Sequence, residues 1–123
     1  MRQRKLINLA LLLSLIMAAF AAETTRKEVA VKGYVLDSAC AFTKGLKKPI
    51  SAECATACAK AGSPLVILTP SATIYWPIAD STPSSSQNDK LLPFAGKNVS
   101  VSGKVFERGG SKAIVISKIE AAE

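Results

Sequence analysis

Histidine is absent from the 123 residues of this chain, and the other residues contain no recognisable catalytic motif. Without histidine there is no side chain that ordinarily exchanges protons near neutral pH, which excludes a nucleophilic triad or an acid–base pair built on histidine. A glycine-rich phosphate loop is also absent, and the acidic residues are scattered singly, which argues against a carboxylate pair or a calcium loop. We therefore expect no catalytic residues and no enzyme activity.

Long apolar runs are also missing, except for one at the N-terminus. Three basic residues precede an almost wholly apolar stretch over residues 6–22, and Ala19-Phe20-Ala21 places small residues where a signal peptidase cleaves. We expect residues 1–21 to be a signal peptide, residues 22–27 to be a flexible mature N-terminus, and the protein to be secreted or periplasmic. An uncleaved membrane anchor is the alternative, because an apolar run of about 17 residues is near the shortest that spans a bilayer.

Apolar and polar residues alternate along much of the remaining chain, which is typical of half-buried β-strands. The sequence Arg108-Gly109-Gly110-Ser111 indicates a hairpin turn between the last two of these segments. Residues 65–68 are apolar at every position, as expected for a strand covered on both faces. The pattern predicts five strands, at Val29–Leu36, Leu65–Leu68, Thr73–Ile78, Val99–Phe106 and Ala113–Ile119.

One helix is expected between the first two strands. Ser51 is a suitable N-cap, residues 52–61 are rich in alanine and lysine, and Gly62 is a natural stop. Further along, residues 80–90 predict a mobile polar loop and residues 91–97 a short apolar turn.

These elements predict a mainly β fold, a five-stranded antiparallel OB-like barrel over residues 28–121. The helical, cysteine-bearing segment 38–62 is expected as an insertion after the first strand. Trp76 shares a face of its strand with two isoleucines and is expected in the core, which places Tyr75 at the surface. An open antiparallel sheet covered by the helix is the alternative.

The chain has three cysteines, Cys40, Cys54 and Cys58. Cys54 and Cys58 are four apart on the predicted helix, so their Cβ atoms lie about 6 Å apart, whereas a disulfide needs about 3.5–4.5 Å. Cys40 is therefore the better partner, and we expect a Cys40–Cys58 disulfide, with Cys40–Cys54 as the alternative. In an exported domain, closing a loop of about 15–19 residues in this way contributes roughly 3 kcal/mol.

An odd number of cysteines leaves the third one to be explained. It is either a free thiol or the partner of a cysteine in a second chain. Alternatively, Cys40, Cys54 and Cys58 together bind a soft metal ion such as Cu(I) or Zn²⁺. A closed zinc site needs a fourth ligand, which here would be Asp37, Glu53 or water. Thiol–disulfide exchange is a further alternative, although the spacing is C-x-x-x-C and not C-x-x-C.

Three segments resemble a group of small, uncharacterised exported bacterial OB-like proteins. They are a G-x-V-x-D-x-x-C segment at Gly33–Cys40, a C-x-x-x-C helix from Cys54 to Gly62, and an F-A-G-K-x-V-x-V-x-G-x-V segment at Phe94–Val105. The resemblance covers nearly the whole mature chain and implies the fold and export, but no activity. Those proteins often have a histidine three residues before the second cysteine, where this chain has Ser51, and this difference weakens a metal site inferred from the resemblance.

The sequence therefore predicts an exported binding or structural module stapled by a disulfide, with thiolate metal binding or thiol-redox chemistry as the alternative. The formal net charge is +7, but part of it lies in the predicted signal peptide and the rest is spread along the chain. We expect a monomer that binds an envelope ligand or protein and does not bind nucleic acid, or the membrane once the signal is cleaved. No cofactor is expected unless the cysteines bind copper or zinc.

Overall fold

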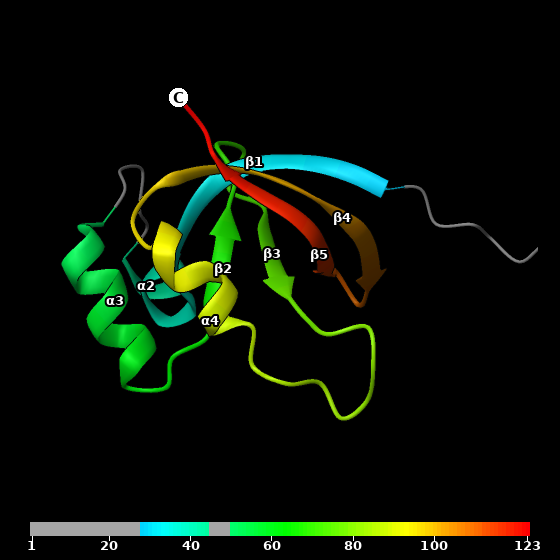
Figure 1. The fold of residues 1–123 in the computed structure, drawn as a ribbon, viewed down its shortest axis with the longest axis horizontal. Helices are drawn as coiled ribbons and strands as arrows, with labels where there is room; N and C mark the ends of the chain where they lie inside the picture. The colour runs from blue at the N-terminus through cyan, green and yellow to red at the C-terminus, as the bar shows by residue number, and fades with distance from the viewer. Residues whose placement is uncertain (1–27, 45–49) are drawn as a thin grey trace, which may run out of the picture.

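The computed structural model describes residues 28–44 and 50–123 (Figure 1). The predicted signal peptide, 1–21, and the predicted mature N-terminus, 22–27, lie outside the described residues, as does part of the predicted loop before the helix. Within the described part of the chain, none of the helices has the length and apolar character needed to cross a membrane.

The five predicted strands are all present and form a closed barrel. They are β1 (Glu28–Asp37), β2 (Leu65–Leu68), β3 (Ile74–Pro77), β4 (Asn98–Arg108) and β5 (Ser111–Ala121). Around the barrel they follow the order β1-β2-β3-β5-β4, and β4 returns to pair with β1. Closure of the barrel rules out the open-sheet alternative.

The barrel is mixed, so the prediction that it is antiparallel was wrong at one pair of strands. β3 and β5 run parallel, with Trp76 opposite Ala113, while the other four pairs are antiparallel. Strand directions cannot alternate all the way around a closed ring with an odd number of strands. At least one neighbouring pair of the five therefore has to be parallel.

The main core lies inside the barrel and follows the alternation seen in the sequence. Val99 and Val101 of β4 and Ile114 of β5 are completely buried, together with Leu91 from outside the strands. Gly103 lies at a register shift between β4 and β5, where a Cβ would come 2.2 Å from the Val115 carbonyl oxygen. A glycine is therefore needed where these two strands approach most closely.

Four short helical elements gather at one side of the barrel, away from the β4–β5 turn (Figure 1). They are α2 (Ser38–Thr43), α3 (Ala52–Lys60), α4 (Asn88–Leu91) and the 3₁₀ turn η1 (Leu92–Phe94). The helix α3 and its N-cap Ser51 confirm the sequence prediction. The helix α2 was not predicted, and α4 with η1 replaces the end of the expected mobile loop and the start of the expected turn.

The predicted environments of the two aromatic residues of β3 were wrong. Tyr75 packs against the main core inside the barrel. Trp76 packs outside it, against a second cluster formed by Leu36, Cys40 and Val66. The helix α2 covers this outer surface. β2 is therefore covered on both faces, as its apolar sequence predicted, and the outer face of β3 also has apolar neighbours.

Candidate metal centre

Asp37, Cys40 and Cys58 meet where β1 passes into the helical segment. Asp37 is the last residue of β1, Cys40 lies on α2 and Cys58 lies on α3. One carboxylate oxygen of Asp37 and the two Sγ atoms all lie within 4.8 Å of one another. These three residues lie within 21 positions of one another in the sequence. They come from three different elements and converge on one point.

The spacing between Asp37 and Cys40 follows from helix capping. Asp37 is the N-cap of α2, and its Oδ2 accepts the backbone N–H of Cys40 at 3.2 Å. Ser51 caps α3 in the same way, because its Oγ accepts the backbone N–H of Cys54 at 3.1 Å. Each cap side chain thus precedes its cysteine by three residues, which is the ordinary spacing of an N-cap bond.

The Asp37 carboxylate is buried and only half satisfied. The residue is 1 % exposed, and its Oδ2 also accepts a hydrogen bond from Ser63 Oγ at 3.2 Å. Among the described residues, Oδ1 has no hydrogen-bond partner and Asp37 has no ion pair. A buried carboxylate is costly unless its charge and lone pairs are matched, so this carboxylate, beside two thiols, is a candidate metal ligand.

Burial raises the pKa of Asp37, but the hydrogen bonds from Cys40 and Ser63 outweigh this effect, and the pKa lies below its ordinary value. The carboxylate is therefore negatively charged at neutral pH. The pKa values of the two neighbouring thiols are instead raised. The interaction of the Cys40 thiol with Asp37, together with burial, raises the pKa of Cys40 to about 11.

Burial raises the pKa of Cys58 as well, and the negative charge of Asp37 adds to this shift. Both thiols therefore keep their protons at neutral pH in the absence of a cation. The reactive species in thiol exchange is the thiolate, so this environment disfavours the thiol-redox alternative. A metal ion would instead reverse the balance, because it stabilises the thiolates and the carboxylate together.

Cys54 and Glu53 lie farther from this centre. Cys54 is exposed on α3, one turn before Cys58, and is near enough to contribute to the raised pKa of that thiol. Glu53 is exposed and lines a shallow depression on the outer face of α3 with Thr56 and Lys60. Of the fourth ligands suggested by the sequence, the structure brings Asp37 to Cys40 and Cys58, while Glu53 and the third predicted ligand, Cys54, lie outside this group.

Two polar residues that were not singled out in the sequence hold this centre together. Asn88 Oδ1 accepts the backbone N–H of Leu65 at 2.8 Å, and its Nδ2 donates to the Ser63 carbonyl at 2.9 Å. Ser63 in turn donates to Asp37. The only sequence signal for these contacts is that asparagine and serine favour helix starts and turns, which says nothing about partners 25 residues away.

All three cysteines are free thiols in the structure. Of the two disulfides suggested by the sequence, Cys40–Cys58 joins the two sulfurs that lie side by side, while Cys40–Cys54 would use an exposed thiol. Both pairings stay predictions.

Comparison of the chain with protein-family models, with curated proteins and with solved structures found no match. The function must therefore be inferred from the geometry of Asp37, Cys40 and Cys58.

Proposed function

We propose that the protein is a small barrel module that binds a zinc ion through Asp37, Cys40 and Cys58. The observation that carries this proposal is the buried Asp37 carboxylate, whose Oδ1 has no hydrogen-bond partner among the described residues and one of whose oxygens lies within 4.8 Å of the Sγ atoms of Cys40 and Cys58. A disulfide would leave this carboxylate unmatched, whereas a cation would bind it.

The separation of the three ligand atoms suits a metal ion after a small movement. Zinc bonds of about 2.0–2.3 Å in a tetrahedral arrangement place neighbouring ligand atoms about 3.5–3.8 Å apart. The three atoms lie within 4.8 Å of one another, so a contraction of at most about 1.3 Å closes the site. Rotation of the half-buried Cys58 side chain is the simplest source of this movement.

Cys54 is the natural fourth ligand. It lies one helical turn before Cys58, so both side chains emerge from the same face of α3. Three thiolates and one carboxylate form a closed four-ligand zinc site, while Cu(I) favours the sulfurs and makes little use of a carboxylate. The position of Asp37 therefore favours zinc over copper.

Bound zinc would fasten α2 and α3 to the end of β1, which is the structural role that the sequence assigned to a disulfide. The strand order and the single parallel pair support an OB-like barrel, and the N-terminal sequence supports export. We infer a monomeric module that displays its loops to an envelope ligand or protein, with no role in nucleic-acid binding.

A second candidate is the same module with a Cys40–Cys58 disulfide in place of the metal. The closeness of these two sulfurs favours it, and an oxidising compartment would supply the conditions. Zinc and the disulfide use the same two sulfur atoms, so the two candidates exclude each other in any one molecule.

The test is the zinc affinity of the reduced protein, measured by competition with a chromophoric chelator. We expect one zinc per chain, and we expect Asp37→Asn to weaken binding at least tenfold, because asparagine still caps α2 but provides no charged ligand. Asp89→Asn is the matched control, since Asp89 lies in the first turn of α4 and its change should have no effect. Absence of zinc binding by the reduced protein would refute the metal site and favour the disulfide.

A further inference from the structure

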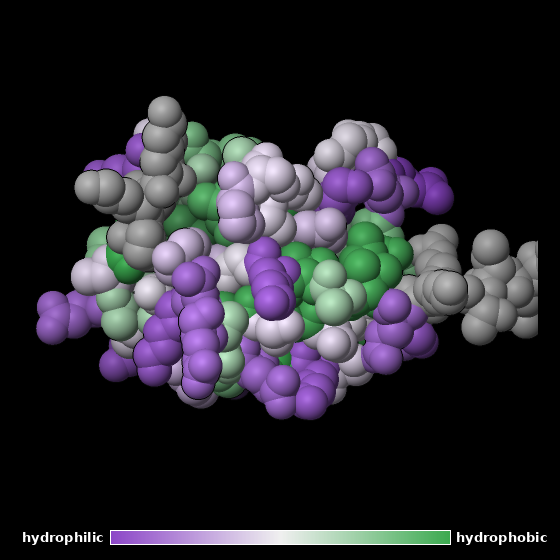
Figure 2. Space-filling model, turned by 90° about the horizontal axis from the view of Figure 1, so that it is seen from above, coloured by the Kyte–Doolittle hydropathy of each residue, from purple (hydrophilic) through white to green (hydrophobic). Residues whose placement is uncertain are grey.

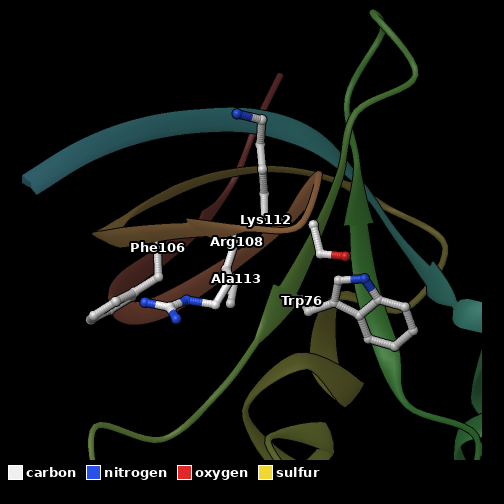
Figure 3. A pocket seen from close by; sticks show the side chains of 6 residues that line it. Trp76, Phe106, Arg108, Lys112 and Ala113 are labelled. Atoms are coloured by element: carbon white, nitrogen blue, oxygen red, sulfur yellow. The ribbon is translucent and has the colours of Figure 1, made fainter.

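An open groove with a volume of about 460 Å³ lies on the outer face of the barrel beside the β4–β5 turn, and it is separate from the cysteine cluster. Its lining residues are Trp76, Phe106, Arg108, Ser111, Lys112 and Ala113 (Figure 3). This size falls in the range of small-molecule sites. Its lining combines aromatic, small and cationic side chains.

Strand register explains the shape of the groove. Trp76 of β3 is opposite Ala113 of β5, and Ala113 is opposite Phe106 of β4, so the three residues form one row across three strands. Neighbouring strands lie about 4.8 Å apart, so the two aromatic residues start about 10 Å from each other with only a methyl group between them. Figure 3 shows Trp76 on one side of Ala113 and Phe106 on the other. The gap is wide enough for one flat ring.

Arg108 supplies the charge of the groove. It follows Phe106 by two residues on β4 and therefore projects from the same face, and Figure 3 shows its guanidinium beside Phe106. Lys112 points to the other side of the sheet, where its Nζ lies 2.6 Å from Glu107 Oε2. Arg108 takes part in none of the ion pairs between described residues. A guanidinium that takes part in no such ion pair is a strong partner for the carboxylate or phosphate of a ligand.

Contacts outside the groove hold the indole of Trp76 in place. Its ring centroid lies 6.1 Å from that of Phe42 on α2, and it packs against the cluster that contains Cys40. A fixed aromatic wall lowers the entropic cost of stacking a ligand on it.

We propose that this groove binds a small planar ring that carries one negatively charged group. The ring lies over Ala113 against Trp76, and the charged group pairs with Arg108. An aromatic carboxylate and a nucleoside monophosphate share this chemistry. The proposal does not depend on the metal centre, whose ligands lie on other elements.

The test follows the indole N–H signal of Trp76, the single tryptophan of the chain, by two-dimensional NMR during separate titrations with benzoate and uridine monophosphate. We expect a saturable shift with at least one of them, and the one that acts identifies the source. Benzamide, which is planar but neutral, and cyclohexanecarboxylate, which is charged but not planar, should bind at least tenfold more weakly.

Two substitutions separate a built site from a general surface effect. Arg108→Gln should weaken binding about tenfold, because it removes the charged pair, whereas Lys118→Gln removes a positive charge elsewhere on β5 and should have no effect. Ala113→Val fills the gap with a strand-compatible side chain and should abolish the shift. The proposal is wrong if neither probe shifts the indole signal at millimolar concentration, or if the two charge variants bind alike.

Discussion

The β4–β5 part of the barrel wall and the helical segment between β1 and β2 are stabilised in different ways. β4 and β5 are each 11 residues long and pair along nearly their whole length, interrupted by one register shift. They completely bury Val99, Val101 and Ile114. In contrast, α2 buries only Cys40, and α3 buries only two alanines. Figure 2 shows hydrophobic surface exposed between polar side chains, so apolar burial is incomplete on the face it presents.

Polar contacts at helix ends replace apolar burial in the helical segment. Asp37 and Ser51 cap α2 and α3, and Asn88 and Ser63 tie the end of α3 to β2 and to Asp37. Each hydrogen bond makes a net contribution of about 1 kcal/mol to stability, which is less than the contribution from fully burying a leucine or isoleucine side chain. A small region held mainly by such contacts gains most from a metal ion or a disulfide, whereas the barrel does not need either.

The largest expected effect is in the barrel. Ile114→Ala removes a fully buried side chain of β5 and should lower the free energy of unfolding by about 2–5 kcal/mol, measured by urea denaturation of the reduced, zinc-free protein. The exposed Lys118→Ala on the same strand should change it by less than about 0.5 kcal/mol. Similar values for the two variants would mean that β5 does not contribute to the core as described.

A smaller, local effect is expected at the start of α2. Asp37→Ala removes the cap and the acceptor of Ser63, and should cost about 1–2 kcal/mol in the zinc-free protein. Hydrogen exchange should show loss of protection at the amides of α2, with the β4–β5 amides unchanged. Ser51→Ala should produce the corresponding loss in α3 alone. Equal loss across the barrel would contradict the separation of the two regions.

The pH dependence of zinc binding distinguishes the helical segment with Cys40 and Cys58 from the rest of the molecule. The pKa of Cys40 is raised to about 11 and that of Cys58 is also raised, so at neutral pH zinc must displace a proton from each thiol. The apparent affinity should therefore increase as pH rises from 6.5 to 7.5, by about a hundredfold per pH unit for the two protons displaced from Cys40 and Cys58, and by a further factor where Cys54 also binds as a thiolate. A pH-independent affinity in chelator competition would contradict binding through these thiols.

The smallest expected difference is in thiol chemistry without metal. Iodoacetamide should modify the exposed Cys54 first and Cys40 last at pH 8, because Cys40 is buried and holds its proton. Peptide mass spectrometry of timed samples measures the order in which the cysteines are labelled. Faster labelling of Cys40 than of Cys54 would contradict the burial of Cys40.

The raised pKa of Cys40 also makes stability depend on pH. Because this pKa rises from 9.0 to about 11 on folding, the protonated thiol stabilises the fold below pH 9, and this contribution is lost as pH rises toward 11.

Most of the barrel could be predicted because its sequence signals are local. The alternation from Val99 to Phe106 and the paired glycines at 109 and 110 specify the β4–β5 hairpin, and Ser51 with Gly62 specifies α3. Strand directions were mispredicted although no local signal was misread. The parallel β3–β5 pair follows only from closure of five strands into a ring, which is a property of the whole fold.

The candidate centre was only partly predictable. The sequence identifies Cys40, Cys54 and Cys58 and includes Asp37 among several fourth ligands, but α2 is too short to give a periodic signal. The orientation of β3 also lacked a local signal, because alternation separates Tyr75 from Trp76 without saying which one faces the barrel interior. The contacts of Asn88 and Ser63 join segments distant in sequence, so they appear only in the folded chain.

The most direct measurement of the central claim is the absorption spectrum of the reduced protein on titration with Co²⁺, which substitutes for zinc and reports its ligands. We expect intense sulfur-to-cobalt charge-transfer bands, tetrahedral ligand-field bands that saturate at one ion per chain, and a spectrum that changes in Asp37→Asn but not in Asp89→Asn. A reduced protein that shows only the spectrum of hydrated Co²⁺ would contradict a metal centre at Asp37, Cys40 and Cys58.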